Sequence, residues 1–127
     1  MKFIASDNLP QAIGPYSPAV KVNGMIYTSG QVPISLDGTM LERDIKVQTR
    51  QVLSNLRTLL EDSNSGLDKV VKVSIFLENI EDFGIVNVLF AEAFGKHKPA
   101  RSTISVKGLP KNSMIMIDAI ALSNDYW

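Results

Sequence analysis

The chain has 127 residues, and thirteen basic side chains balance thirteen acidic ones, so its formal net charge is zero. This length suits one domain with a single core, and neutrality disfavours phosphate-dominated binding to nucleic acid or anionic membranes. Cysteine is absent and His97 is the only histidine, which excludes disulfides and thiol chemistry and leaves only carboxylates for a metal cluster. The sequence therefore predicts one domain over residues 1–127 without a metal site.

The two ends of the chain carry little functional signal. Residues 1–7 lack the long apolar run of a signal peptide, and no later segment approaches the length of a membrane span. We therefore expect a cytoplasmic protein. Tyr126 and Trp127 are expected to pack on a neighbour or to fray.

The first third of the chain predicts a short strand, a loop and a hairpin. Residues 2–5 form the strand, and residues 7–18 contain the prolines and Gly14 that interrupt regular structure. Apolar runs at 19–22 and 25–29 flank Asn23-Gly24, a strong hairpin signal. Pro15 stiffens the turn that presents Tyr16. This ring either packs over a core edge or contacts a ligand, and its loop position favours the ligand.

The hairpin runs into Ser29-Gly30. A glycine here lets the backbone approach a ligand or another chain closely and leaves amide groups available as donors. A simple strand end is the competing interpretation, and the pattern alone favours it.

Residues 44–62 predict an amphipathic helix with Asp44 as its amino-terminal cap. Its apolar side chains recur on one face, whereas Arg50 and Arg57 fall on the solvated side. A second helix is predicted over 80–94, capped by Asn79. In that helix Asn87 lies within an aromatic stripe and needs a partner, and Gly84 suggests a close packing contact.

Three strands complete the pattern. In residues 69–78, Val71 and the alternate residues after it predict an inner face, with Val70 on the outer face. Residues 114–122 are apolar on both faces except at Asp118, which requires a partner or a wet interface. Between these two segments, residues 100–106 alternate, so that Arg101, Thr103 and Ser105 share one face.

Arg101 is the most informative side chain of these strands. Its guanidinium carries five donors in a fixed fork and suits a planar carboxylate or a phosphate. On spacing alone a surface ion pair at an edge strand is the favoured alternative.

The order of elements predicts an α+β domain, a mixed sheet with two helices on one face. Two helices can cover only one side of such a sheet. The apolar residues on its other face therefore call for another subunit, and closed symmetric assembly is the usual solution.

Several separated motifs together resemble the RidA family of reactive intermediate deaminases. They are Ile13–Ser17, Tyr27–Gln31, Gln48–Val52, Val86-Asn87, Pro99–Thr103 and Leu109–Lys111. The resemblance implies a chorismate-mutase-like subunit and a homotrimer with a central barrel and ligand sites between subunits. It also implies hydrolysis of enamines and imines, such as 2-iminobutanoate and 2-iminopropanoate, to 2-keto acids and ammonia without a cofactor.

The resemblance also implies site residues. Arg101 matches the arginine that grips the substrate carboxylate, and Asn87 the amide near it. Tyr16 matches the pocket tyrosine, whereas Ser29 and Gly30 match a segment from the neighbouring subunit that approaches the ligand. Thr103 falls two residues beyond Arg101, where the family often has cysteine, serine or threonine.

One position departs from this pattern. Met116 aligns with a glutamate that is thought to orient or activate water, and a thioether cannot accept a proton at neutral pH. The resemblance thus implies an imine deaminase, whereas Met116 motivates the alternative, a carboxylate-binding regulatory trimer. Ribonuclease or translation-inhibitor activity is disfavoured because the chain is neutral and has a single histidine.

Overall fold

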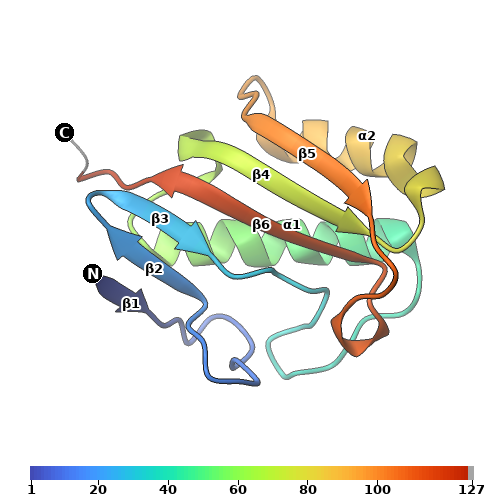
Figure 1. Ribbon diagram of the computed structural model, residues 1–127, viewed down its shortest axis with the longest axis horizontal. Coiled ribbons are helices and arrows are strands. Elements are labelled where there is room, and N and C mark those ends of the chain that lie inside the picture. Colours follow the sequence, from blue (N-terminus) through green and yellow to red (C-terminus); the bar gives the residue numbers. More distant parts are fainter. Residues whose placement is uncertain (126–127) are drawn as a thin grey trace.

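The computed structural model describes residues 1–125 and shows one six-stranded sheet with two helices on one face (Figure 1). The predicted contacts of Tyr126 and Trp127 lie outside these residues. The strand order is β1-β2-β3-β6-β4-β5, in which β4 and β5 are parallel and the other neighbours antiparallel. The predicted α+β architecture with a mixed sheet is confirmed. The elements are β1 (Lys2–Ile4), β2 (Ala19–Val22), β3 (Met25–Thr28), α1 (Ile45–Asp62), β4 (Val70–Leu77), α2 (Phe83–Phe94), β5 (Ala100–Ser105) and β6 (Ile115–Leu122), with short 3-10 turns η1 (Leu67–Lys69), η2 (Ile80–Asp82) and η3 (Pro110–Asn112).

Helix α1 begins as the sequence predicts. The Asp44 carboxylate accepts hydrogen bonds from the backbone N–H groups of Lys46 and Val47 and caps the helix. The apolar stripe faces the sheet and is buried, whereas Arg50 and Arg57 are exposed. The buried amide of Gln48 donates to the Leu41 and Glu42 carbonyls and accepts from the Met114 N–H, which fastens the helix start to β6.

The predicted faces of β4 are wrong at its first two residues. Val70 is buried and Val71 is 44% exposed, the reverse of the prediction. The register with β6 shifts between Val70 and Lys72, so one extra residue enters β4 there as a bulge. A one-residue slip reverses the side-chain alternation, and the predicted inner face at Val73, Ile75 and Leu77 holds only beyond the bulge.

The second predicted helix begins one turn later than its pattern indicates. Asn79 caps the 3-10 turn η2 by accepting from the Glu81 N–H, and α2 starts at Phe83. The close packing expected at Gly84 is also wrong. A Cβ built there would meet no atom within 4 Å.

Within residues 1–125 no element covers the sheet face opposite the helices (Figure 1). Tyr27 is 41% exposed and Ile104 is 51% exposed, and their strand neighbours Ile120 and Phe76 are half-buried. Apolar side chains gathered on one face mark an interaction surface. Among residues 1–125 no helix is long and apolar enough to cross a membrane.

Candidate functional site

Arg101 lies at the start of β5 with its guanidinium held on two sides. Nη2 donates a hydrogen bond to Oδ1 of Asn87 on α2. The guanidinium carbon lies 5.4 Å from the centroid of the Phe83 ring and 5.0 Å from that of Phe90. The Asn87 amide is the polar group that the sequence predicts to need a partner within the aromatic stripe, and Arg101 is that partner. Since a single amide engages the fork, further N–H donors are available for an anion.

Thr103 follows on the same face of β5. Register with β4 places Arg101 beside Val73 and Thr103 beside Ile75, both buried under the helices. The Thr103 hydroxyl is buried and has no hydrogen-bond partner among the described residues. An unpaired buried hydroxyl costs about 1–3 kcal/mol.

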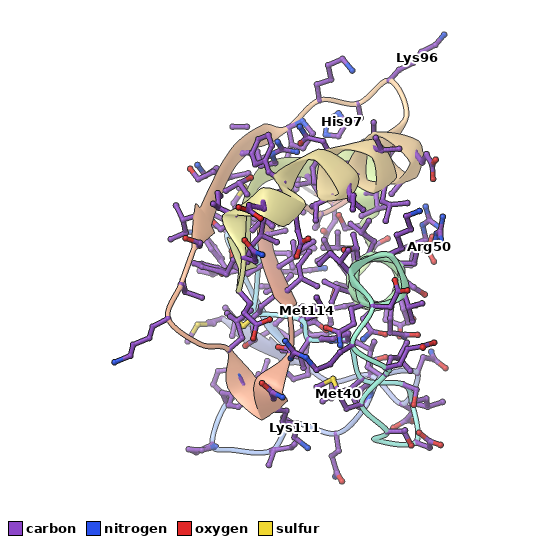
Figure 2. The ribbon with its side chains drawn as sticks, turned by 90° about the vertical axis from the view of Figure 1, so that its right-hand side faces the viewer. Met40, Arg50, Lys96, His97, Lys111 and Met114 are labelled. Carbon is purple, nitrogen blue, oxygen red and sulfur yellow. The ribbon has the colours of Figure 1, made fainter. Side chains whose placement is uncertain are left out.

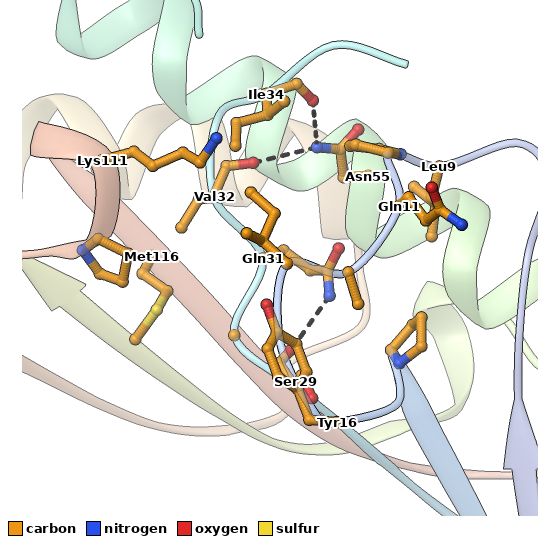
Figure 3. A pocket seen from close by; sticks show the side chains of 16 residues that line it. Leu9, Gln11, Tyr16, Ser29, Gln31, Val32, Ile34, Asn55, Lys111 and Met116 are labelled. Carbon is orange, nitrogen blue, oxygen red and sulfur yellow. Dashed lines mark hydrogen bonds between the residues drawn. The ribbon is translucent and has the colours of Figure 1, made fainter. Parts of the chain in front are cut away.

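A separate cavity of about 510 Å³ lies beyond the carboxyl end of strand β3 (Figure 3). Its walls come from the loop before β2, the segment after β3, turn η3 and strand β6. Tyr16, Ser29 and Gly30 all line it, as does Met116. The structure therefore brings together the Tyr16 loop and the Ser29-Gly30 segment, which are separated by a hairpin in the sequence.

Ser29 ties the Tyr16 loop to the hairpin. Its Oγ donates to the Ser17 carbonyl at 2.7 Å, and its N–H donates to the Pro18 carbonyl at 2.8 Å. The Ser29 hydroxyl is thus committed to holding the loop. Neither the N–H nor the C=O of Gly30 bonds to another of the described residues, which leaves this peptide free for a ligand.

Met116 packs directly on Gly30. A Cβ built at Gly30 would lie 2.5 Å from Sδ of Met116 and 2.8 Å from its Cγ. Such distances are far inside van der Waals contact, so residue 30 must be glycine while Met116 keeps this position. The close backbone approach predicted at Gly30 is therefore made by a side chain of the same chain.

Asn55 and Lys111 are among the lining residues that were not predicted as site residues. The Asn55 amide on α1 donates to the Val32 and Ile34 carbonyls and fixes one wall (Figure 3). A polar residue on the buried side of an amphipathic helix was the available signal. Lys111 also lines the cavity and has a φ of 55°, which is unusual for a residue with a side chain. Its signal was membership in the Leu109–Lys111 motif.

The six predicted site residues form two groups in one chain. Arg101, Asn87 and Thr103 gather beside α2, whereas Tyr16, Ser29 and Gly30 line the cavity. Strands β6 and β4 lie between β3 and β5, so the Arg101 group belongs to a different part of the sheet.

Other ionisable groups play structural parts. The ring of His97 bonds through Nε2 to the Val70 carbonyl at 2.7 Å and stacks on Phe94, and Figure 2 shows it at the opposite end of the molecule from Lys111. Asp118 lies opposite Ser74 on the uncovered sheet face, and burial raises the pKa of its carboxyl. Within residues 1–125 no three His, Asp or Glu side chains converge to ligate a metal ion.

Comparison with known proteins identifies the family. Residues 6–123 match the model of the family described as "Endoribonuclease L-PSP". The chain is 45% identical over 122 residues to "Putative regulator AldR" of Lactococcus lactis, which covers 95% of this chain and 97% of that protein. It is 37% identical over 124 residues to the 2-iminobutanoate/2-iminopropanoate deaminase of Salmonella typhimurium, which covers 95% and 97%.

A solved structure agrees with this match. The E. coli TdcF structure with bound serine superposes with a TM-score of 0.92 at 30% identity, covering 98% of this chain and 100% of that one. The architecture above is thus that of a known group of proteins. The chain belongs to the Endoribonuclease L-PSP family, which is the RidA/YjgF family that its motifs resemble.

Proposed function

We propose that this protein is an imine deaminase that hydrolyses 2-imino acids, such as 2-iminobutanoate and 2-iminopropanoate, to 2-keto acids and ammonia. The observation that carries the proposal is the guanidinium of Arg101, oriented by Asn87 and by two aromatic rings. A planar carboxylate is the partner that such a fork binds best. The Salmonella relative is named for this activity.

The residues divide the reaction between them. Arg101 binds the carboxylate, which fixes the neighbouring C=N carbon. Tyr16 and the free peptide of Gly30 orient the imine. Water then attacks that carbon, and a C–O bond forms as the C=N π bond opens to a carbinolamine. Both protons of the water pass to the nitrogen, and the C–N bond breaks as the C=O bond forms and ammonia leaves in its protonated form. No carboxylate stands at Met116, so we assign the electrophilicity to the protonated imine and the placement of water to backbone groups. A general base contributes about 10²–10⁴ in rate. We therefore expect this protein to hydrolyse the imine more slowly, by a factor in this range, than a site with a glutamate in place of Met116.

We further propose that the complete site forms between copies of the chain in a homotrimer. The Arg101 group and the Tyr16 cavity are separate in one chain, and an uncovered apolar sheet face is available for assembly. A cyclic arrangement places the Arg101 group of one copy against the cavity of the next.

Mixing two impaired variants tests this arrangement. Arg101→Ala removes the carboxylate grip and Tyr16→Ala removes the exposed ring, and neither of the two side chains is itself buried. Co-refolded mixtures should hydrolyse 2-iminobutanoate faster than the average of the two parents, since some interfaces then combine an intact Arg101 with an intact Tyr16. A rate equal to that average in mixtures shown to be hybrid would contradict a shared site.

A second candidate function is a carboxylate-binding regulatory trimer. Met116 favours it, because a pocket that keeps Arg101 but lacks the acid can bind without efficient chemistry. Tight binding of a 2-keto acid without turnover would support this candidate. RNA cleavage, which the family description names, receives no support from a neutral chain with one histidine.

A further inference from the structure

Met116 forms a wall of the cavity in a defined position. Its side chain is half-buried, projects from β6 on the uncovered sheet face and packs on Gly30, with Sδ 2.5 Å from where a Cβ would stand. Met116 lines the same cavity as Tyr16 and Ser29 (Figure 3). A ligand that reaches the free peptide of Gly30 therefore lies beside the thioether.

Other apolar side chains contribute to the walls of this cavity. Val32, Ile34 and Pro110 line the same cavity. A thioether is polarisable and adaptable, and it neither donates a hydrogen bond nor holds a water firmly. A polar ligand side chain placed against this wall would lose its hydration without gaining a partner.

We propose that Met116 is a specificity-determining residue, which selects 2-imino and 2-keto acids with an apolar branched or thioether side chain. The proposal rests on the proposed function, since Arg101 must hold the carboxylate. Each buried methylene strengthens binding about fourfold. 4-Methyl-2-oxopentanoate has three carbons more than pyruvate. Even if the cavity buries these carbons only in part, the affinity should rise about tenfold or more.

Lys111 defines the competing selectivity. It is the cation that lines this cavity among the described residues, and its ammonium favours a ligand with an acidic side chain. A cavity governed by Lys111 would prefer 2-oxoglutarate to 4-methyl-2-oxopentanoate. The two residues thus predict opposite rankings of two ligands that both carry the 2-keto carboxylate.

Calorimetric titration of the assembled protein with these three keto acids tests the proposal. In the wild type, 4-methyl-2-oxopentanoate should bind about tenfold or more tightly than pyruvate and more tightly than 2-oxoglutarate. Met116→Gln keeps the length of the side chain but adds an amide, and it should reduce the preference for 4-methyl-2-oxopentanoate over pyruvate to less than about threefold. Met116→Leu keeps an apolar side chain and should retain this preference. Met114→Gln is the matched control, because Met114 precedes Met116 by two residues and is not part of the cavity wall.

The outcomes separate this inference from the proposed function. Equal preferences in the wild type and Met116→Gln, or a ranking led by 2-oxoglutarate, would overturn the role of Met116 while leaving the carboxylate site standing. A wild type that binds no keto acid would instead overturn the proposed function and this inference with it. Thermal melts of each variant show whether a lost preference reflects a lost fold.

Discussion

Asn87 on α2 and Arg101 on β5 are joined by a hydrogen bond from Nη2 of the guanidinium to Oδ1 of the amide. The bond aligns the fork while leaving its charge uncompensated, because an amide oxygen is a neutral acceptor. Within residues 1–125 Arg101 has no ion pair, whereas Arg43 pairs with Glu78. Arg101 is thus oriented and still available to an anion.

Substitution of Asn87 should therefore weaken carboxylate binding without abolishing it. Asn87→Ala removes one hydrogen bond to a charged group and should weaken keto acid binding about tenfold. Asn87→Asp should weaken it further, since the new carboxylate would pair with Arg101 and compete with the ligand. Calorimetric titration measures both effects, and wild-type affinity in both variants would contradict the positioning role.

The contact between Gly30 and Met116 predicts a coupled effect on stability. Gly30→Ala puts a methyl group against the thioether, and since the end of the Met116 side chain is flexible, it should lower the free energy of unfolding by about 1 kcal/mol, the low end of the cost of overpacking. In a Met116→Ala background the obstructing atoms are gone and the same substitution should cost less than about 0.5 kcal/mol. Urea denaturation at one protein concentration measures the double-mutant cycle. Equal costs in both backgrounds would show that another contact requires the glycine.

Gly84 offers a stabilising substitution. It lies inside α2, where an added Cβ would have no atom within 4 Å, so Gly84→Ala should raise the free energy of unfolding by about 0.5–1 kcal/mol. Gly95→Ala is the matched control at the end of the same helix. Its φ of 61° disfavours a side chain, so this variant should be less stable than the wild type. A Gly84→Ala protein that melts below the wild type would indicate a covering partner on α2.

Asp118 predicts a pH dependence with a definite sign. Burial raises the pKa of this carboxyl above its ordinary value of 3.8, and a hydrogen bond from Ser74 opposes the shift. The folded state then holds the proton more tightly than the unfolded state. Its stabilising contribution is present below pH 3.8 and is lost as the pH rises through the raised pKa of the folded state. Asp118→Asn should therefore raise the melting temperature at pH 7, with the gain disappearing in acid. A lower melting temperature at pH 7 would show that the carboxylate has a cationic partner in the assembly.

Local patterns predicted most of the fold but not its local irregularities. The cap at Asp44 and the hairpin at Asn23-Gly24 depend on neighbouring residues, so the sequence alone located them. The bulge after Val70 depends on pairing with β6, about fifty residues away, and alternation within β4 could not indicate it. The 3-10 turn before Phe83 was missed because its residues fit a helical pattern equally well.

Some features of the candidate site also followed from the local sequence, whereas others depend on the fold. The need of Asn87 for a partner followed from its aromatic neighbours. The fork of Arg101 suited a carboxylate or a phosphate, and only the family resemblance implied a substrate carboxylate. The separation of Arg101 from the Tyr16 cavity follows from strand order, which the motifs do not contain. Lys111 entered the cavity wall through two consecutive residues with positive φ, at Lys111 and Asn112, which no local composition rule required.

The measurement that tests the central claim most directly is the decay of 2-iminobutanoate generated in situ from an amino acid. The wild type should accelerate the decay. Arg101→Ala should lower kcat/KM about 100-fold, because it removes two charge-assisted hydrogen bonds to the carboxylate, each of about 1.5 kcal/mol. Arg101→Lys keeps the charge but not the planar fork, so its kcat/KM should lie between that of the wild type and that of Arg101→Ala.

Met116→Glu completes the set. If the wild type is inactive and Met116→Glu gains activity, the pocket serves binding, and the regulatory candidate replaces the deaminase. Wild-type acceleration that vanishes in Arg101→Ala is the result we predict. Acceleration that survives unchanged in Arg101→Ala would contradict the account at its centre, because the imine would then be hydrolysed without the carboxylate grip.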